Sequence, residues 1–282
     1  VSNGGLLAAG GANFPEKKPW EGGKKVWHAQ VFLLEKPEGP WKSVGRLPTP
    51  VAYGAAVPTD EGVLCIGGSD AERHHDSCWE IVLREGALII LPYPRLPKPC
   101  ANMCAVRIAH RVYVLGGSES PASTEALCNF WMLDLQALKK GWQILEPWPG
   151  AGRIYPIAAA DASNVYLVSG AKLRSDPGGK PVREYCRDAY RYSQKNGWQS
   201  LPNLPRATVA APAPASIENG ILSIVSGDDG TLTEFEPKER HPGFPRNTLE
   251  FDTSKNAWSL GESVPFSLAT APVVEWNGRV VI

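Results

Sequence analysis

A unit of about 50 residues recurs along this chain, a period typical of folds built from one repeated module. Each unit begins with an apolar segment of small residues, and a second apolar run ends in Gly-Gly or Ser-Gly. The second runs are residues 6–11, 63–68, 112–117, 165–170 and 222–227, with a sixth begun at 279–282. Continuous Val, Leu and Ile segments are typical of strands buried on both faces. The repeat therefore predicts an all-β chain.

The second half of each unit predicts how the strands pack. A third strand carrying an aromatic residue is expected at residues 31–34, 130–134, 189–192 and 249–252. The units close with Trp41, Trp142, Trp198 and Trp258, whereas the second unit has Leu91-Pro92 at that point. A tryptophan on an outer strand can wedge between neighbouring sheets and bury a large apolar area.

We therefore predict a six-bladed kelch-type β-propeller, with five near-complete blades and a shared or partial sixth. Radial closure removes the exposed strand edges that an open array would leave. Residues 1–282 are expected to form a single propeller domain that is incomplete at both ends. The first unit lacks most of its innermost strand, and the last unit stops at Ile282, within its second strand.

Composition excludes several classes of function. The 29 basic and 29 acidic residues balance, which argues against nucleic acid as a partner. No apolar run reaches the length that crosses a bilayer, so no membrane segment is expected. The six cysteines contain no Cys-x-x-Cys pair, so no metal site is predicted and reduced, buried thiols are the simpler interpretation.

In such a propeller, the loops after the second strands and the crossovers into the next blade share one face, which frames the axial channel. Polar and aromatic residues of these segments are candidates for binding a substrate. The candidates are Asn13, Trp20, Arg73, Glu119, Arg153 and Asp229. Glu119 and Asp229 are also secondary candidates for acid/base catalysis.

A structural alternative stands beside each candidate. Trp20 either stacks on a sugar or packs against its own loop. Arg73 lies in a polar cluster with His74 and His75, and this cluster is either part of a binding site or simply a solvated loop. The acids Glu119 and Asp229 are good turn residues as well. Arg153 either presents its planar guanidinium group to a ligand carboxylate or covers the outside of a blade.

Several motifs resemble the cyclically permuted branch of the N-acetylneuraminate (sialic acid) mutarotase/epimerase family. They lie at residues 10–15, 19–28, 66–74, 117–122, 182–185, 227–230 and 241–245. The resemblance implies an isomerase that interconverts the α and β anomers of a sugar acid, uses no cofactor and acts outside the cytoplasm. It leaves a homodimer open.

The resemblance also bears on individual residues. The family's Gly-Glu-x-x-Pro-Gly-x-Arg signature, which holds its proton acceptor and an essential arginine, is expected after Ile282. The main catalytic residues are therefore not assigned within this chain, while Arg153 matches an arginine that non-permuted relatives carry at the equivalent crossover. The alternative function is a non-catalytic kelch propeller that binds a protein or a glycan.

Overall fold

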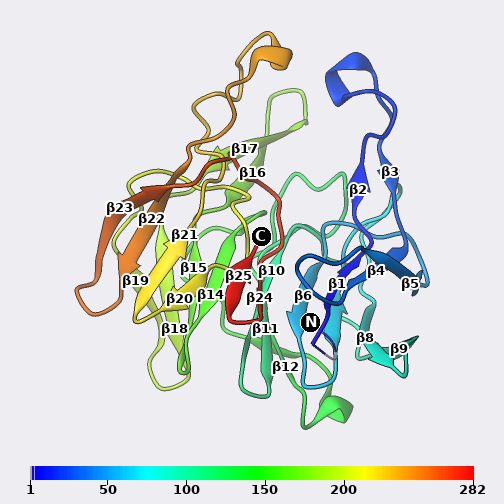
Figure 1. Cartoon of the computed structure of the whole chain (residues 1–282). Coiled ribbons are helices and arrows are strands. Elements are labelled where there is room, and N and C mark those ends of the chain that lie inside the picture. Colours follow the sequence, from blue (N-terminus) through cyan, green and yellow to red (C-terminus); the bar gives the residue numbers. More distant parts are fainter. Residues whose placement is uncertain (1, 3) are drawn as a thin grey trace.

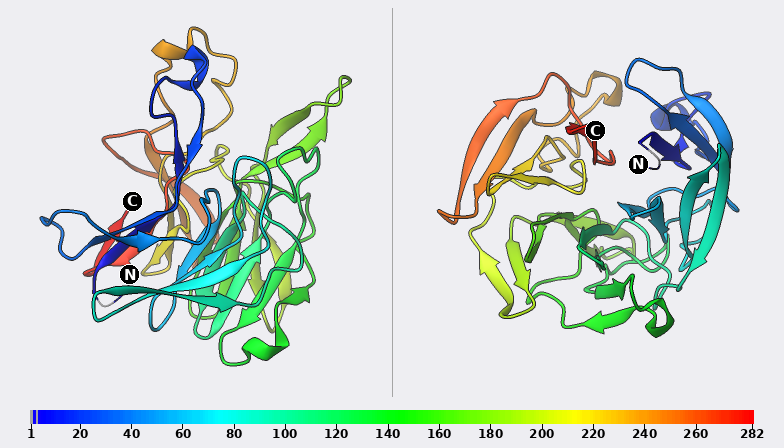
Figure 2. Two further views of the ribbon diagram at one scale, coloured as in Figure 1. Left: turned by 90° about the vertical axis from the view of Figure 1, so that its right-hand side faces the viewer. Right: turned by 60° about the horizontal axis from the view of Figure 1, so that its bottom comes forward.

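The computed structural model describes residue 2 and residues 4–282, which form antiparallel sheets around a common axis (Figures 1 and 2). We call the five larger sheets blades 1 to 5 in chain order. Blade 1 contains β1 (Leu6–Ala9), β4 (Gln30–Leu34) and β5 (Lys42–Arg46). Blade 2 contains β6 (Ala55–Pro58), β7 (Val63–Ile66), β8 (Cys78–Arg84) and β9 (Ala87–Tyr93). Blade 3 contains β10 (Cys104–Ile108), β11 (Arg111–Leu115), β12 (Phe130–Asp134) and β13 (Gln143–Leu145).

The second half of the chain repeats this arrangement. Blade 4 contains β14 (Ile157–Ala160), β15 (Asn164–Val168), β18 (Ala189–Ser193) and β19 (Gly197–Leu201). Blade 5 contains β20 (Ser216–Glu218), β21 (Ile221–Ile224), β22 (Asn247–Asp252) and β23 (Ala257–Ser263), and the pair β24 (Val274–Trp276) and β25 (Arg279–Val281) follows it. The all-β propeller predicted from the repeat is confirmed, including the strand order within a unit; the number of six blades stays a prediction.

Smaller elements interrupt the blades. They are the hairpin of β2 (Ala12–Asn13) and β3 (Val26–Trp27), the hairpin of β16 (Ala171–Ser175) and β17 (Pro181–Tyr185), and the 3-10 turns η1 (Pro19–Glu21), η2 (Leu138–Lys140) and η3 (Lys238–Arg240). Both hairpins and the segment that carries η3 project from the same end of the molecule (Figure 1). The predicted common face for the loops after the second strands is thus confirmed for these three. No helix in the described part of the chain has the length and apolar character to span a bilayer.

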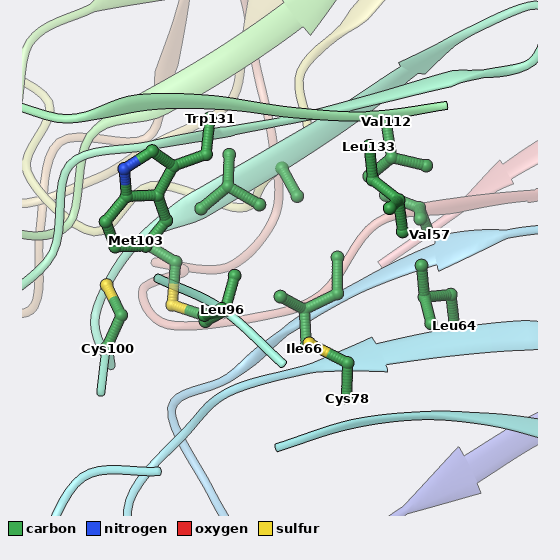
Figure 3. Close-up of a cluster of buried hydrophobic side chains, with 12 residues drawn as sticks. Val57, Leu64, Ile66, Cys78, Leu96, Cys100, Met103, Val112, Trp131 and Leu133 are labelled. Atoms are coloured by element: carbon green, nitrogen blue, oxygen red, sulfur yellow. The ribbon is translucent and has the colours of Figure 1, made fainter. Parts of the chain in front are cut away.

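Apolar side chains fill the wedges between neighbouring blades. Between blades 2 and 3, Ile66 and Leu64 of β7 pack with Val112 and Leu133 of blade 3, beside Trp131 (Figure 3). Each of these side chains is nearly or fully buried. Burial on both faces of a strand explains why the second runs of the repeat are continuously apolar rather than alternating.

The closing tryptophans of blades 3 to 5 link each of these blades to the one before it, whereas Trp41 of blade 1 is 49% exposed and does not form the predicted wedge. Three of them donate their indole N–H to a backbone carbonyl at the end of the preceding blade, each at 2.9 Å: Trp142 to Pro94, Trp198 to Glu146, and Trp258 to Pro202. The predicted wedging of tryptophan between blades is confirmed for these three. The two chain ends are linked in a similar way, because the Trp276 indole donates to the Gly4 carbonyl at 2.7 Å, and both termini lie on the same side of the ring (Figure 2).

The glycine pairs of blades 2 and 3 end the second strands where no side chain fits. Gly117 has a φ of +105°, and a Cβ there would lie 2.5 Å from Cys100 Sγ and 2.7 Å from the Ala101 carbonyl oxygen. Only glycine adopts this backbone region easily and leaves room for so close an approach. The pairs therefore let the next crossover pack directly against the end of the strand.

Candidate functional site

Five residues with positive φ form a continuous series of backbone hydrogen bonds beside the axis. Each lies shortly before the innermost strand of its blade and has a φ between 50° and 61°, a region that non-glycine residues seldom occupy. The N–H of each of the last four donates to the carbonyl of the equivalent residue one blade earlier, at 2.6–3.2 Å. In chain order these residues, named the inner arc here, are Tyr53, Asn102, Tyr155, Ala210 and Thr270.

The long loops start beside this inner arc. The residue before each of the first four arc positions pairs, as an isolated β-bridge, with the residue that follows the glycine pair of the same blade. These bridges are Ala52 with Ser69, Ala101 with Ser118, Ile154 with Ala171, and Val209 with Asp228. Backbone strain held in place by such contacts is common at functional sites. The inner arc and the starts of these loops form one candidate site.

Lys25, at the base of the first hairpin, reaches the first arc residue. Its Nζ lies 2.9 Å from Tyr53 Oη and 5.0 Å from the centroid of the Tyr53 ring, with Phe14 and Trp27 at 5.4 and 5.7 Å. Aromatic faces attract the ammonium group without neutralising it. The half-buried Lys25 thus places its ammonium group among aromatic rings at the edge of the site.

Arg183, on β17, takes a similar place beside the third arc residue. Its guanidinium carbon lies 5.3 Å from the centroid of Tyr155. Burial raises the pKa of Tyr155, and the nearby Arg183 charge only partly offsets this. Tyr155 is therefore a neutral phenol, able to donate a hydrogen bond, at physiological pH.

Acidic and amide groups complete the site. Tyr185, two residues after Arg183, places its hydroxyl 2.6 Å from Asp228 Oδ2, and burial together with this contact raises the pKa of Tyr185. In the first hairpin, Asn13 Oδ1 lies 2.9 Å from His28 Nε2. The site therefore offers cations, neutral hydroxyl donors, an amide and a carboxylate, a set suited to a hydroxylated anionic ligand.

A separate open cleft of about 600 Å³ lies between the loops of blades 2 and 3. Arg73 and Glu119 line it, and Glu119 also pairs with Lys98 at 3.1 Å. The two histidines are not solvated, contrary to the loop interpretation: His74 and His75 are 7% and 9% exposed. His74 Nδ1 lies 2.9 Å from the Ser118 carbonyl, and burial lowers its pKa. No group of three His, Cys, Asp or Glu side chains in residues 2 and 4–282 is arranged to hold a metal ion.

Comparisons with known proteins agree with this fold and with the motifs. A family model described as N-acetylneuraminate epimerase matches residues 1–90. The N-acetylneuraminate epimerase of Haemophilus influenzae (strain PittEE) is 42% identical over 215 residues, covering 67% of this chain and 54% of that protein. That of Pasteurella multocida (strain Pm70) is 41% identical over 78 residues, covering 24% of this chain and 20% of that protein.

The chain is a relative of the N-acetylneuraminate epimerases. It spans about half the length of the Haemophilus influenzae protein. A solved structure titled "Structure of YjhT" superimposes with a TM-score of 0.69 at 12% identity, covering 99% of this chain and 87% of that one. The resemblance seen in the motifs is thus confirmed, and the cyclic permutation stays a prediction.

The residues predicted to bind an epimerase substrate fall into separate places. Asn13 lies in the first hairpin, and Trp20, 45% exposed, lies on η1 with the Lys18 ammonium 5.3 Å from its ring. Asp229 follows Asp228 but caps its own turn, accepting hydrogen bonds from the N–H and hydroxyl of Thr231 at 3.0 and 2.7 Å. Arg73 and Glu119 share the separate cleft. Ligand binding by these residues stays a prediction.

Arg153 has a role that differs from the expected one. Its side chain is 0% exposed, so it does not present a free guanidinium at the channel mouth. It donates to both carboxylate oxygens of Asp188, at 3.0 and 2.8 Å, and to the Ser169 carbonyl at 3.0 Å. Hydrogen bonding to Asp188 outweighs burial and keeps the pKa of Arg153 raised. The arginine therefore joins parts of blade 4, and a substrate carboxylate has no access to it.

The sequence analysis missed the arc residues themselves. Tyr53, Asn102 and Tyr155 stand at one position of the repeat, where blade 5 has Ala210 and the next unit has Thr270. Bulky polar side chains at a repeat position that elsewhere carries small residues are a signal that an alignment of the units could have revealed. Lys25 and Arg183 lay within quoted motifs but were not singled out.

Proposed function

We propose that this protein interconverts the α and β anomers of N-acetylneuraminate by acid/base opening and closing of the sugar ring. The relationship to the Haemophilus influenzae N-acetylneuraminate epimerase, at 42% identity over 215 residues, carries this proposal. The residues of the inner arc and the cations beside it support the proposal, because a sugar acid needs cations for its carboxylate and hydroxyl or amide partners for its hydroxyls.

The reaction couples proton transfers to the breaking and re-forming of one C–O bond. A base takes the proton of the anomeric hydroxyl while an acid protonates the ring oxygen, and the bond between that oxygen and the anomeric carbon breaks. The open keto form turns its carbonyl and recloses on the other face, returning both protons. Positioned acid and base groups typically contribute about 10²–10⁴-fold, so the proposed isomerase requires no cofactor.

The main proton acceptor and its arginine are still expected after Ile282. Within this chain, Asp228, with its Tyr185 partner at 2.6 Å, is the carboxylate that borders the inner arc. Glu119 and Asp229 stay secondary candidates. Action outside the cytoplasm, inferred from the family resemblance, also stays a prediction.

The test follows anomer exchange by proton NMR in the full-length protein. A sialidase releases the α anomer, and its conversion to the β anomer is timed with native protein, with heat-denatured protein and with none. We expect the first-order rate constant for exchange of sugar bound to native protein to be at least about 100-fold larger than the rate constant measured without protein. Saturable binding of the sugar without acceleration would instead favour the non-catalytic glycan-binding module.

A further inference from the structure

We propose that Lys25 and Arg183 form a two-sided cation clamp that receives the carboxylate of the sugar acid above Asn102. This inference rests on the proposed function for the identity of the ligand. It concerns two residues that have no carboxylate partner among the described residues, and it assigns to them the carboxylate recognition first expected of Arg153.

Both cations lack a carboxylate partner. In the described part of the chain, no Asp or Glu oxygen lies within 4.0 Å of Lys25 or Arg183, although ten other Lys or Arg side chains pair with a carboxylate. Lys25 is half-buried among three aromatic rings. Placing an uncompensated ammonium in such a position is costly unless a ligand uses its charge.

The β16–β17 hairpin separates its charges between two faces. Neighbouring side chains of a strand point to opposite sides, and Glu184 pairs on one side with Lys172 and Arg174, both at 2.6 Å. Arg183 and Tyr185, which flank Glu184, belong to the other side, where they contact Tyr155 and Asp228. The hairpin thus pairs its outer cations and leaves Arg183 available on the side of the inner arc.

The inner arc connects the two tyrosines that the cations contact. Asn102 N–H donates to the Tyr53 carbonyl at 2.8 Å, and Tyr155 N–H donates to the Asn102 carbonyl at 2.7 Å. Asn102 is therefore flanked by the tyrosine that holds Lys25 and the tyrosine that lies under Arg183. Its half-buried side-chain amide donates to Ser118 Oγ at 3.3 Å.

This geometry suits one carboxylate better than a neutral sugar group. The planar guanidinium of Arg183 offers a pair of N–H donors, and Lys25 contributes a point charge from the other side. The hydroxyls of Tyr53 and Tyr155 can serve the oxygens of the sugar ring. Selectivity for a sugar acid follows, because a neutral sugar would leave both cations without a counterion.

The experiment compares N-acetylneuraminate with its methyl ester, which has the same ring and no negative charge. Binding to the full-length protein is measured by calorimetry or by ligand-observed NMR, for the wild type, Lys25→Met, Arg183→Met and the double variant. We expect each single variant to weaken binding of the acid by about 10- to 100-fold and to change binding of the ester little. The double variant should bind both compounds alike.

Matched controls come from neighbouring cations. Lys24→Met removes an adjacent exposed lysine, and Arg174→Met removes the arginine of the outer face; both should keep the preference for the acid. The clamp is overturned if the double variant retains that preference, if acid and ester weaken equally, or if the wild type prefers neither compound.

Binding and turnover separate the two proposals. A wild type that prefers the acid through Arg183 but does not accelerate anomer exchange would support the clamp and refute the mutarotase. A wild type that accelerates exchange while the double variant still selects the acid would support the mutarotase and refute the clamp.

Discussion

Replacing Arg153 by methionine should lower the free energy of unfolding by about 3 kcal/mol, because it breaks a buried ion pair and leaves its partner behind. Loss of one partner of such a pair typically costs about 3–5 kcal/mol. Arg153 is 0% exposed, but the Asp188 side chain is 34% exposed and can regain water, so the lower end of this range applies. At roughly 2–4 °C per kcal/mol, the melting temperature should fall by roughly 6–12 °C.

Urea denaturation followed by tryptophan fluorescence measures the change, with Arg174→Met as control. Arg174 pairs with Glu184 at 2.6 Å, but its side chain is 55% exposed, so its loss should cost less than about 1 kcal/mol. A stable Arg153→Met protein that had lost sugar binding would refute the structural role and restore the ligand role.

The pH dependence of the same variant provides a second measure. Although burial opposes it, the hydrogen bonds from Arg153 lower the pKa of Asp188 below its ordinary value of 3.8. The stability that this pair contributes is therefore present above that value and is lost as the pH falls through the lower, folded pKa. The difference in unfolding free energy between wild type and Arg153→Met should shrink as the pH falls from about 5 to 2; a constant difference would contradict the argument.

Three further predictions test the fold. Trp198→Phe keeps an aromatic wedge but removes the 2.9 Å bond to the Glu146 carbonyl, so calorimetric unfolding should show a loss of about 1 kcal/mol; no loss would mean that the bond is dispensable. Gly117→Ala places a Cβ 2.5 Å from Cys100 Sγ and should cost more than about 1 kcal/mol in urea denaturation, whereas unchanged stability would show that the site relaxes freely. Burial raises the pKa of Cys100, so mass spectrometry should find the exposed Cys128 alkylated by iodoacetamide long before Cys100; equal rates would indicate local opening.

The fold was predictable because the same local pattern is repeated. Each repeated feature takes the same place in its blade: the apolar second strand is buried, glycine ends that strand, and tryptophan closes the unit. A period near 50 residues puts these features at equivalent points of successive blades. The third strand expected at residues 130–134 is β12, Phe130–Asp134. The tryptophans were placed between blades, but their carbonyl partners were not, because these partners lie at the end of another unit.

The site was less predictable, because its contacts join residues distant in sequence. Arg153 looked exposed at a crossover, yet Asp188, 35 residues later, pairs with it inside blade 4. Lys25 meets Tyr53 only through the fold of the first hairpin. The pattern of one unit carries no information on which side chain of another unit it will meet.

The inner arc has a consequence for how such a site can change during evolution. Its backbone is fixed by N–H groups that reach from one blade to the next, so the ring sets the position of each side chain independently of that side chain's chemistry. Exchanging the amino acid at one arc position should alter ligand preference while leaving the architecture intact. In a ring built this way, substitutions at the arc positions can produce new ligand specificities while the backbone scaffold stays the same.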